Sequence, residues 1–222
     1  FYTCFYGSND NEAFTIPDIP SLKYNCYYYT NNKDMIKKLE NTKWIAVYDN
    51  KPLNNNIIES CMNGKHVKTM PHLYKELKDY SYTCFLDSKL DKVNDIFVEE
   101  FIEKYFKEEN YAILLRKHWF VNDLWEEFEE SMLQPRYIDQ KEQYIKYIHK
   151  QIENGLDAGI KQHCACGFLI RNMKHKKIKQ LNETWYKHIQ ECGIQDQISF
   201  NFVKQLFEGY WYSFTEIPFS SL

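Results

Sequence analysis

The chain has 222 residues and a formal net charge of −3 at pH 7, and hydrophobic residues make up 44% of it, aromatic residues 17% and charged residues 27%. This composition excludes a disordered chain and predicts a globular fold with an aromatic-rich core or cleft. The small negative charge gives no reason to expect nucleic acid or an anionic membrane as a partner, so an anionic substrate would need a local basic site. We expect residues 1–222 to form one domain and to act as a monomer.

The cysteines are odd in number and scattered, at Cys4, Cys26, Cys61, Cys84, Cys164, Cys166 and Cys192. They do not suggest paired disulfides, and they predict thiols in a reducing compartment such as the cytoplasm, or the host cytoplasm for a viral protein. His163 beside two of them suggests zinc, but no second Cys/His pair stands at zinc-site spacing, so burial is favoured. The sequence contains neither a leader pattern nor an apolar stretch of about 18 residues, and it begins at Phe1 rather than Met, as a piece of a longer protein would.

The first part of the chain alternates short apolar runs with helical patterns. In order, it predicts a strand over 1–6 closed by a turn, a strand over 24–29, a helix over 33–39, a strand over 44–48, a helix over 56–63 that stops at Gly64, and a short helix that begins at Pro71. This is the order of βα units in a parallel sheet.

The rest of the chain continues the alternation. It predicts a strand over 82–86, a helix over 96–106, a strand over 111–115, helices over 122–132 and 139–152, a strand over 164–170, helices over 176–190 and 196–207, and an aromatic tail. The fold class is therefore α/β, with a central, mainly parallel sheet of about six strands flanked by helices.

The apolar run over 82–86 ends abruptly at Asp87, and this stretch marks the expected working centre. Ligands of open α/β sheets bind in the crevice outside the carboxyl ends of the strands. A carboxylate there suits a hard divalent ion, Mn²⁺ or Mg²⁺, which takes one or two protein carboxylates and completes its shell with substrate phosphates. Nucleotide-sugar chemistry is therefore the first hypothesis.

Short motifs spread over nearly the whole chain match one family. They are Tyr2 to Gly7 with Asp10, Lys68 to His72, Leu86 to Lys89, Lys117-His118 with Trp125-Glu126-Glu127, Leu169 to Arg171, and Asn182 to Trp185 ahead of Asp196 to Phe200. With these motifs the chain resembles the glycosyltransferase-like domain of plant, bacterial and viral proteins that was long catalogued as a domain of unknown function. It is also similar to the first domain of the chlorovirus enzymes that glycosylate capsid protein.

The resemblance implies a GT-A-type fold, a UDP-sugar donor, a divalent ion such as manganese, and a glycan or glycoprotein acceptor. Most GT-A enzymes carry two acids as D-x-D, whereas this chain has Lys89 in the second place. Either Asp87 holds the ion with fewer protein ligands or Asp91 substitutes. The family also tends to carry Arg three positions after the His of its K-H motif, where Val121 stands here, so we expect the choice of sugar or acceptor to differ.

Glycosyl transfer requires that the charge of the leaving diphosphate is neutralised and that water is kept out. We expect Lys68 to contact the diphosphate, with Lys89 and Arg171 as further partners, although a plain surface charge explains a single lysine about as well. Lys68 is favoured because it precedes the helix start at Pro71, whose N-terminus adds positive potential, and His72 is counted with it as substrate-binding.

The first strand carries Thr3, Phe5 and Tyr6, and an aromatic face with a nearby hydroxyl suits a uracil ring and its ribose. Core packing explains Phe5 equally well.

Acceptor binding and catalysis are expected from the second half of the chain. One of His118, Glu126 and Glu127 would bind acceptor hydroxyls or act as a base, the alternative being exposed helical acids. Asp196 and Gln197 resemble the Asp-Gln pair that retaining GT-A transferases place near the donor sugar. Asp196 is equally well placed as an ordinary helix N-cap. The pair favours retention, whereas inversion would require a carboxylate base opposite the leaving group.

Two other functions compete with glycosyl transfer. Asp87-Ser-Lys89 also fits the D-x-K of metal-dependent nucleases, with Asp18 as the upstream acid, but the chain has no basic stripe for nucleic acid. A non-catalytic module that binds sugar nucleotides or glycans is the second alternative, because the second acid of D-x-D is missing.

Overall fold

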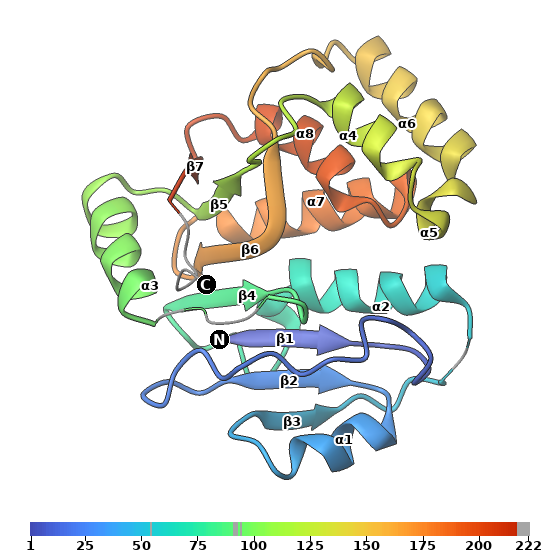
Figure 1. Cartoon of the computed structure of the whole chain (residues 1–222). Coiled ribbons are helices and arrows are strands. Elements are labelled where there is room, and N and C mark those ends of the chain that lie inside the picture. Colours follow the sequence, from blue (N-terminus) through green and yellow to red (C-terminus); the bar gives the residue numbers. More distant parts are fainter. Residues whose placement is uncertain (54, 91–92, 94, 217–222) are drawn as a thin grey trace.

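The computed structural model describes residues 1–53, 55–90, 93 and 95–216, and in them one seven-stranded sheet has the order β3-β2-β1-β4-β6-β5-β7 (Figure 1). The strands are β1 (Tyr2–Phe5), β2 (Tyr27–Thr30), β3 (Ile45–Tyr48), β4 (Tyr82–Leu86), β5 (Ile113–Lys117), β6 (Cys164–Asn172) and β7 (Trp211–Phe214). The predicted α/β class is confirmed. The seventh strand comes from the aromatic tail, where no strand was predicted.

The first four strands of the chain form a parallel half-sheet. β2 pairs in parallel with β1 and β3, and β1 pairs in parallel with β4. β6 runs antiparallel to both β4 and β5, so the sheet is mixed beyond β4. The carboxyl ends of β1 and β4 therefore point to the same edge, where the crevice was expected (Figure 1).

Helices cover both faces of this sheet. Their bounds are α1 (Lys33–Leu39), α2 (Ile57–Thr69), η1 (Pro71–Leu73), α3 (Asp95–Phe101), the π-helical η2 (Ile102–Glu108), α4 (Leu124–Ser131), α5 (Pro135–Ile138), α6 (Lys141–Glu153), α7 (Ile178–Cys192) and α8 (Asp196–Leu206). None of these helices, in the part of the chain that is described, is long and apolar enough to cross a membrane.

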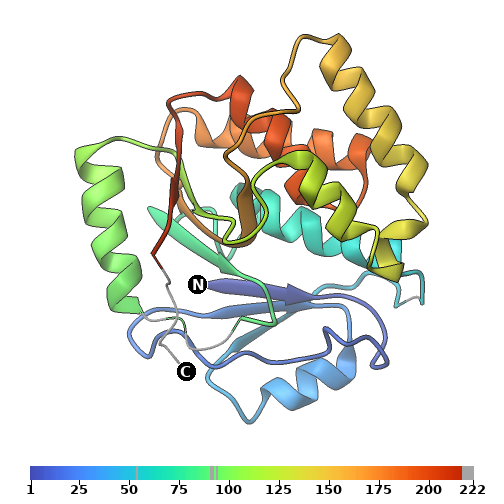
Figure 2. The same ribbon diagram turned by 45° about the horizontal axis from the view of Figure 1, so that its top comes forward.

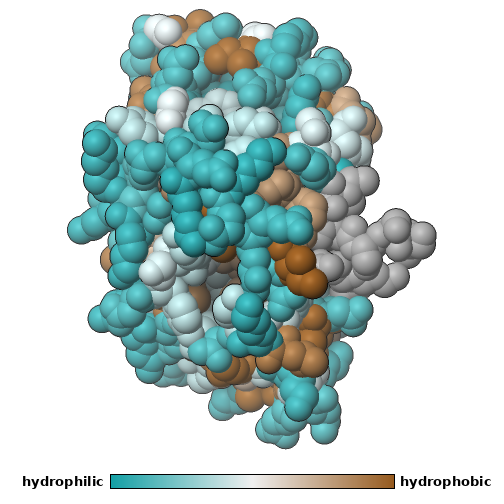
Figure 3. Space-filling model, turned by 90° about the vertical axis from the view of Figure 1, so that its left-hand side faces the viewer, coloured by the Kyte–Doolittle hydropathy of each residue, from teal (hydrophilic) through white to brown (hydrophobic). Residues whose placement is uncertain are grey.

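The side chains of each strand alternate between two cores, as the period of a strand requires. On one face Tyr2 packs with Trp185 of α7 and other residues of α2, α7 and α8. On the other face Phe5 packs with Met35 of α1 and Val98 of α3. An outer layer of α4, α5 and α6 packs on α7 and α8 through a third cluster (Figures 1 and 2). The side of the molecule on which α3 lies has a largely hydrophilic surface (Figure 3).

Helix α2 differs from the prediction in a way that affects the site. It begins after Asn56, whose side chain accepts a hydrogen bond from the Glu59 amide, but it continues through Gly64 to Thr69. The predicted end at Gly64 is wrong, because Gly64 has no positive φ and does not cap the helix. A Cβ there would lie 3.5 Å from Cys4 Sγ, which is an ordinary contact, so Gly64 is an interior residue of the helix on the side that faces β1.

Replacing this glycine tests the continuous helix. We expect Gly64→Ala to raise the free energy of unfolding by about 0.5–1 kcal/mol, because alanine has the higher helix propensity and its Cβ meets only ordinary contacts. Urea unfolding measures the change. Gly193→Ala is the matched control: Gly193 has φ +117° and a Cβ there would meet Tyr144 at 2.8 Å, so this variant should be destabilised. Destabilisation of Gly64→Ala would contradict a continuous α2.

Candidate active site

A cavity of about 970 Å³ lies at the carboxyl ends of β1, β4 and β5. Segments that follow these strands line it, together with one side of α2, the middle of β6 and the start of α8. Nine of the residues predicted from the sequence are among its lining residues: Phe5, Tyr6, Lys68, Asp87, Lys89, His118, Glu127, Asp196 and Gln197. The fold therefore brings predicted residues that are far apart in the sequence, from Phe5 to Gln197, to one cavity.

Three predicted substrate residues lie outside this lining. Thr3 is fully buried in β1. His72 contacts Asn182 through Nδ1 at 3.3 Å, and its Nε2 lies 3.6 Å from Glu183. Arg171 is fully buried behind the cavity, where its Nη1 donates to Tyr2 Oη at 2.9 Å. We therefore assign them no direct contact with a ligand. Asp91, the second predicted metal ligand, lies outside the described residues.

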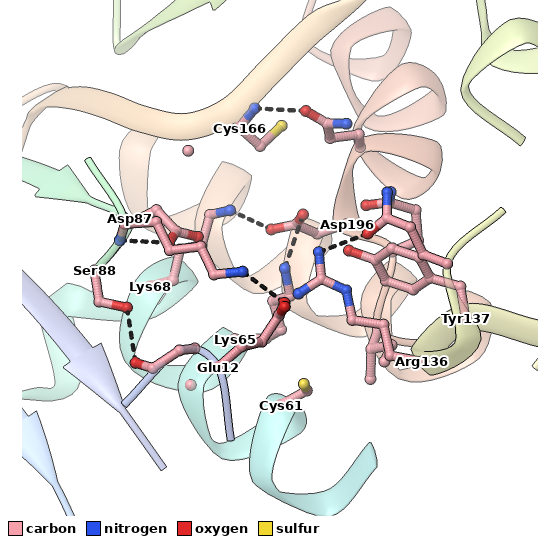
Figure 4. Close-up of a pocket in the computed structure, with 18 of the residues that line it drawn as sticks. Glu12, Cys61, Lys65, Lys68, Asp87, Ser88, Arg136, Tyr137, Cys166 and Asp196 are labelled. Atoms are coloured by element: carbon pink, nitrogen blue, oxygen red, sulfur yellow. Dashed lines mark hydrogen bonds and ion pairs between the residues drawn. The ribbon is translucent and has the colours of Figure 1, made fainter. Parts of the chain in front are cut away.

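The lining of the cavity includes a buried carboxylate that is held by two lysines of α2. Lys65 Nζ lies 2.9 Å from Asp196 Oδ1, and Lys68 Nζ forms an ion pair with Asp196 Oδ2. The lysines share one helical face because they are three positions apart. In Figure 4, Asp87 and Ser88 lie on one side of this cluster, and Arg136 and Tyr137 lie on the other.

Charge balance at this cluster sets the protonation of Asp196. Burial by itself would raise the pKa of the carboxyl group, but the two lysines outweigh burial and hold the pKa below its usual range. The pKa of Lys65 is raised because the attraction of Asp196 outweighs the cost of burial. Asp196 and Lys65 therefore both carry charge at neutral pH.

Asp196 is the first residue of α8 and not its N-cap, so the ordinary capping interpretation is wrong. Gln195 occupies the N-cap position, without a side-chain capping bond. The start of α8 is fixed instead by Ser199 Oγ, which donates to the Asp196 carbonyl at 2.9 Å and accepts from Trp185 Nε1 at 3.2 Å. A carboxylate in the first turn also interacts favourably with the helix dipole.

Gln197 connects α8 to an irregular part of β6. The register between β5 and β6 shifts at Leu115 and Arg116, which removes Cys166 from the regular ladder. The Cys166 amide donates instead to Gln197 Oε1 at 3.1 Å. The bulge carries Gly167, whose carbonyl accepts from the Asp87 amide at 2.8 Å, so the same irregularity positions Asp87.

Asp87 is exposed at the end of β4, as the sequence predicted. Its Oδ1 accepts a hydrogen bond from the Lys89 amide at 3.1 Å, and Lys89 Nζ lies 2.6 Å from Glu12. No group of three or more His, Cys, Asp or Glu side chains that could hold a metal lies among the residues described. A single exposed carboxylate nevertheless fits a Mg²⁺ or Mn²⁺ ion that takes most of its ligands from substrate phosphates and water.

A second polar cluster lies beside Glu127. Glu127 Oε1 accepts hydrogen bonds from Gln195 Nε2 at 2.7 Å and from Ser131 Oγ at 3.3 Å. Glu127 Oε2 lies 3.2 Å from His163 Nε2 and 3.9 Å from His118 Nε2. Burial lowers the pKa of His118, so its ring is neutral at pH 7. Glu126, the other acid considered, accepts from the Asn122 amide and lies outside the cavity lining.

Two packed aromatic residues lie at the end of β1 and directly after it. Phe5 and Tyr6 line the cavity, although each is only 4% exposed. Phe5 contacts Phe14 edge-on, and Tyr6 Oη donates to Asp49 at 2.9 Å. Both residues therefore belong to the core as well as to the cavity.

Sequence reasoning missed several residues of this site. Lys65 was overlooked because the helix was expected to end at Gly64, although its spacing of three from Lys68 was a usable signal. Arg136 and Tyr137 belong to α5, a short helix whose Pro135 at the first position was also a signal. Trp119, which follows His118, was missed because no periodic pattern in the sequence around it predicted its position in the fold.

Removing the charge of Asp196 should destabilise the protein. Asp196→Asn leaves Lys68 buried without its counter-charge, and we expect a loss of about 3 kcal/mol in unfolding free energy at pH 7. The folded pKa lies below the unfolded value of about 3.9, so the difference between wild type and variant should stay constant above that value and shrink only as the pH falls through the folded pKa. Urea unfolding from pH 8 to pH 3 measures it. A difference that disappears near pH 6 would contradict this pairing.

The comparisons with known proteins concern the fold. No model of a protein family matches the sequence, and the search of curated proteins gives no match. Among solved structures, the chain is similar to the apo form of mouse xyloside xylosyltransferase 1, with a TM-score of 0.53 and 10% sequence identity over 96% of this chain and 83% of that one. This likeness concerns the fold alone, which is similar to that of this xylosyltransferase.

Proposed function

We propose that the protein is a glycosyltransferase that moves a sugar from a UDP-sugar to a glycan or glycoprotein acceptor. The observation that carries the proposal is the arrangement of Lys65, Lys68 and Asp196 in one cavity with Asp87 at the end of β4. A protein that binds such a donor needs cations that contact the diphosphate and a carboxylate that contacts the sugar. The likeness to a xylosyltransferase fold supports the same class.

The two lysines differ in how freely they can meet a diphosphate. The Lys68 side chain is 6% exposed and stays beside Asp196, whereas the Lys65 side chain is 20% exposed. Lys65 can therefore turn toward a phosphate oxygen while Lys68 keeps the carboxylate paired. Charge-assisted hydrogen bonds of this kind are about twice as strong as neutral ones. The uridine would then lie toward Phe5 and Tyr6.

A divalent ion at Asp87, when bound, would neutralise part of the charge of the leaving diphosphate. Asp87 is the described carboxylate that would hold the ion, and the Lys89 amide, which donates to Asp87 Oδ1, would orient that carboxylate. The fit rests on a single described carboxylate, so most ligands of the ion would come from the donor and from water.

In the reaction, the acceptor oxygen forms a bond to the anomeric carbon as the bond from that carbon to the diphosphate oxygen breaks. Asp196 would hold sugar hydroxyls and stabilise the positive charge that develops at the anomeric carbon. In a retaining reaction the acceptor proton passes to the leaving diphosphate on the same face. Glu127 is the carboxylate that would take this proton in an inverting reaction, and the Asp-Gln pair favours retention.

A non-catalytic sugar-nucleotide module is the alternative that one observation favours. In the described part of the chain, Asp87 belongs to no group of three or more His, Cys, Asp or Glu side chains that could hold a metal. The nuclease alternative loses support because Lys89, the basic residue of its motif, pairs with Glu12.

The first test measures donor binding and turnover together. We expect Mn²⁺ to tighten UDP binding roughly tenfold in calorimetry, and Asp87→Asn to remove most of that gain, since one ligand of the shared ion is lost. A panel of UDP-sugars with an acceptor mixture should give UDP release with one donor. Asp95→Asn, at the start of α3, is the matched control. Equal UDP affinity with and without metal in both proteins would remove Asp87 as a ligand, and binding without turnover would favour the module.

A second test concerns the lysines. We expect Lys65→Ala to weaken UDP binding roughly 10- to 100-fold, as the loss of one charge-assisted hydrogen bond predicts, while uridine binding changes less than about threefold. Calorimetry with both ligands measures this difference. Lys75→Ala, whose side chain is 86% exposed outside the cavity, is the control. Equal losses for UDP and uridine would argue against a diphosphate contact.

A further inference from the structure

The loop between β5 and α4 forms a fixed turn at the cavity. His118 Nδ1 accepts a hydrogen bond from the Val121 amide at 3.1 Å, which closes the turn around Trp119 and Phe120. The His118 amide donates to the His163 carbonyl at 2.9 Å, and Val121 is buried. Both ends of the turn are therefore anchored to the fold, and its position does not depend on the two residues at its tip.

The tip of this turn carries two large aromatic side chains that belong to none of the three core clusters. Trp119 is 63% exposed and Phe120 is 57% exposed, and both line the cavity. Turn tips ordinarily carry Gly, Asn, Asp or Ser, and an exposed aromatic pair contributes little to the core. Three other tryptophans in the described part of the chain are far less exposed, namely Trp44, Trp185 and Trp211. Trp125 is 39% exposed but does not line the cavity.

Neighbouring side chains hold the indole in a defined orientation. The His118 ring stacks on Trp119 with centroids 4.6 Å apart and an interplanar angle of 12°. The Arg116 guanidinium lies 4.7 Å from the indole centroid, and Phe120 meets the His118 ring edge-on at 4.7 Å. A rigid aromatic surface of this kind loses little entropy when a ligand binds, which is the property of a preformed binding site.

We propose that Trp119 and Phe120 form the binding subsite for the acceptor, and that the acceptor is a glycan recognised by stacking of a pyranose ring on these side chains. The inference rests on the proposed function and adds the acceptor's chemical class and its place. Sugar rings present an apolar C–H face to an aromatic ring and hydroxyls at their edge. Glu130 and Gln134 line the same cavity and supply polar partners for such hydroxyls.

The position of the subsite fits transfer between two substrates. The turn belongs to the β5–α4 side of the cavity, while the lysines and Asp87 belong to α2 and β4. Glu127 lies on α4, the helix that the turn leads into, and its carboxylate lies 3.9 Å from His118 Nε2. An acceptor sugar on Trp119 would therefore approach the donor from the side where Glu127 is.

The test uses defined glycosides and UDP as separate probes. Saturation-transfer NMR with methyl glycosides of xylose, glucose, galactose, mannose and rhamnose should identify at least one sugar that binds the wild-type protein. Trp119→Ala and Phe120→Ala should each weaken it roughly tenfold or more, as the loss of one stacked aromatic contact predicts, with UDP affinity unchanged in calorimetry. Trp125→Ala is the matched control and should keep both affinities.

Each result separates this inference from the proposed function. UDP binding without binding of any glycoside would overturn the acceptor subsite and leave the proposed function standing. Glycoside binding that depends on Trp119, without UDP binding, would support the subsite and overturn the proposed transfer. Equal losses of UDP and glycoside in Trp119→Ala, or an equal loss of glycoside in Trp125→Ala, would overturn the subsite.

Discussion

The pairing of one buried carboxylate with two lysines is the constraint on which the site depends. Asp196 begins α8, and Lys65 and Lys68 project from α2, so the ion pairs join two helices that are far apart in the sequence. Burying charge is costly, and apolar side chains would often stabilise such a place as well or better. Retention of three charges inside a cavity is therefore better explained by a ligand that needs them than by stability.

The surrounding polar groups are arranged so that this cluster keeps its place. Tyr2 Oη donates to the Lys68 carbonyl at 2.9 Å, and Arg171, expected at the substrate, donates to the same hydroxyl. Arg171 thus acts as a buried support behind α2. Gln197 fixes the β6 bulge from the other side. Preorganised groups of this kind hold their orientation when charge develops in a reaction, which is what electrostatic catalysis requires.

Local patterns were enough to predict the α/β class and the residues at strand ends. Asp87 was found because an apolar run stops at an acid, and Asp196 because its motif resembles a known one. The reversed direction of β6 was not predictable, since a single strand carries no signal of its direction in the sheet. Lys65 was missed because glycine often ends helices, whereas Gly64 lies inside α2, which continues to Thr69. Trp119 was missed because exposure at a turn tip depends on the fold around it.

The most direct test of the account is a crystal structure of the protein with UDP and Mn²⁺. We expect the diphosphate in the cavity, with a phosphate oxygen within hydrogen-bond distance of Lys65 or Lys68, the ion on Asp87, and the uracil near Phe5 and Tyr6. UDP bound at another place, or a diphosphate that contacts neither lysine while Asp196 keeps both ion pairs, would contradict it.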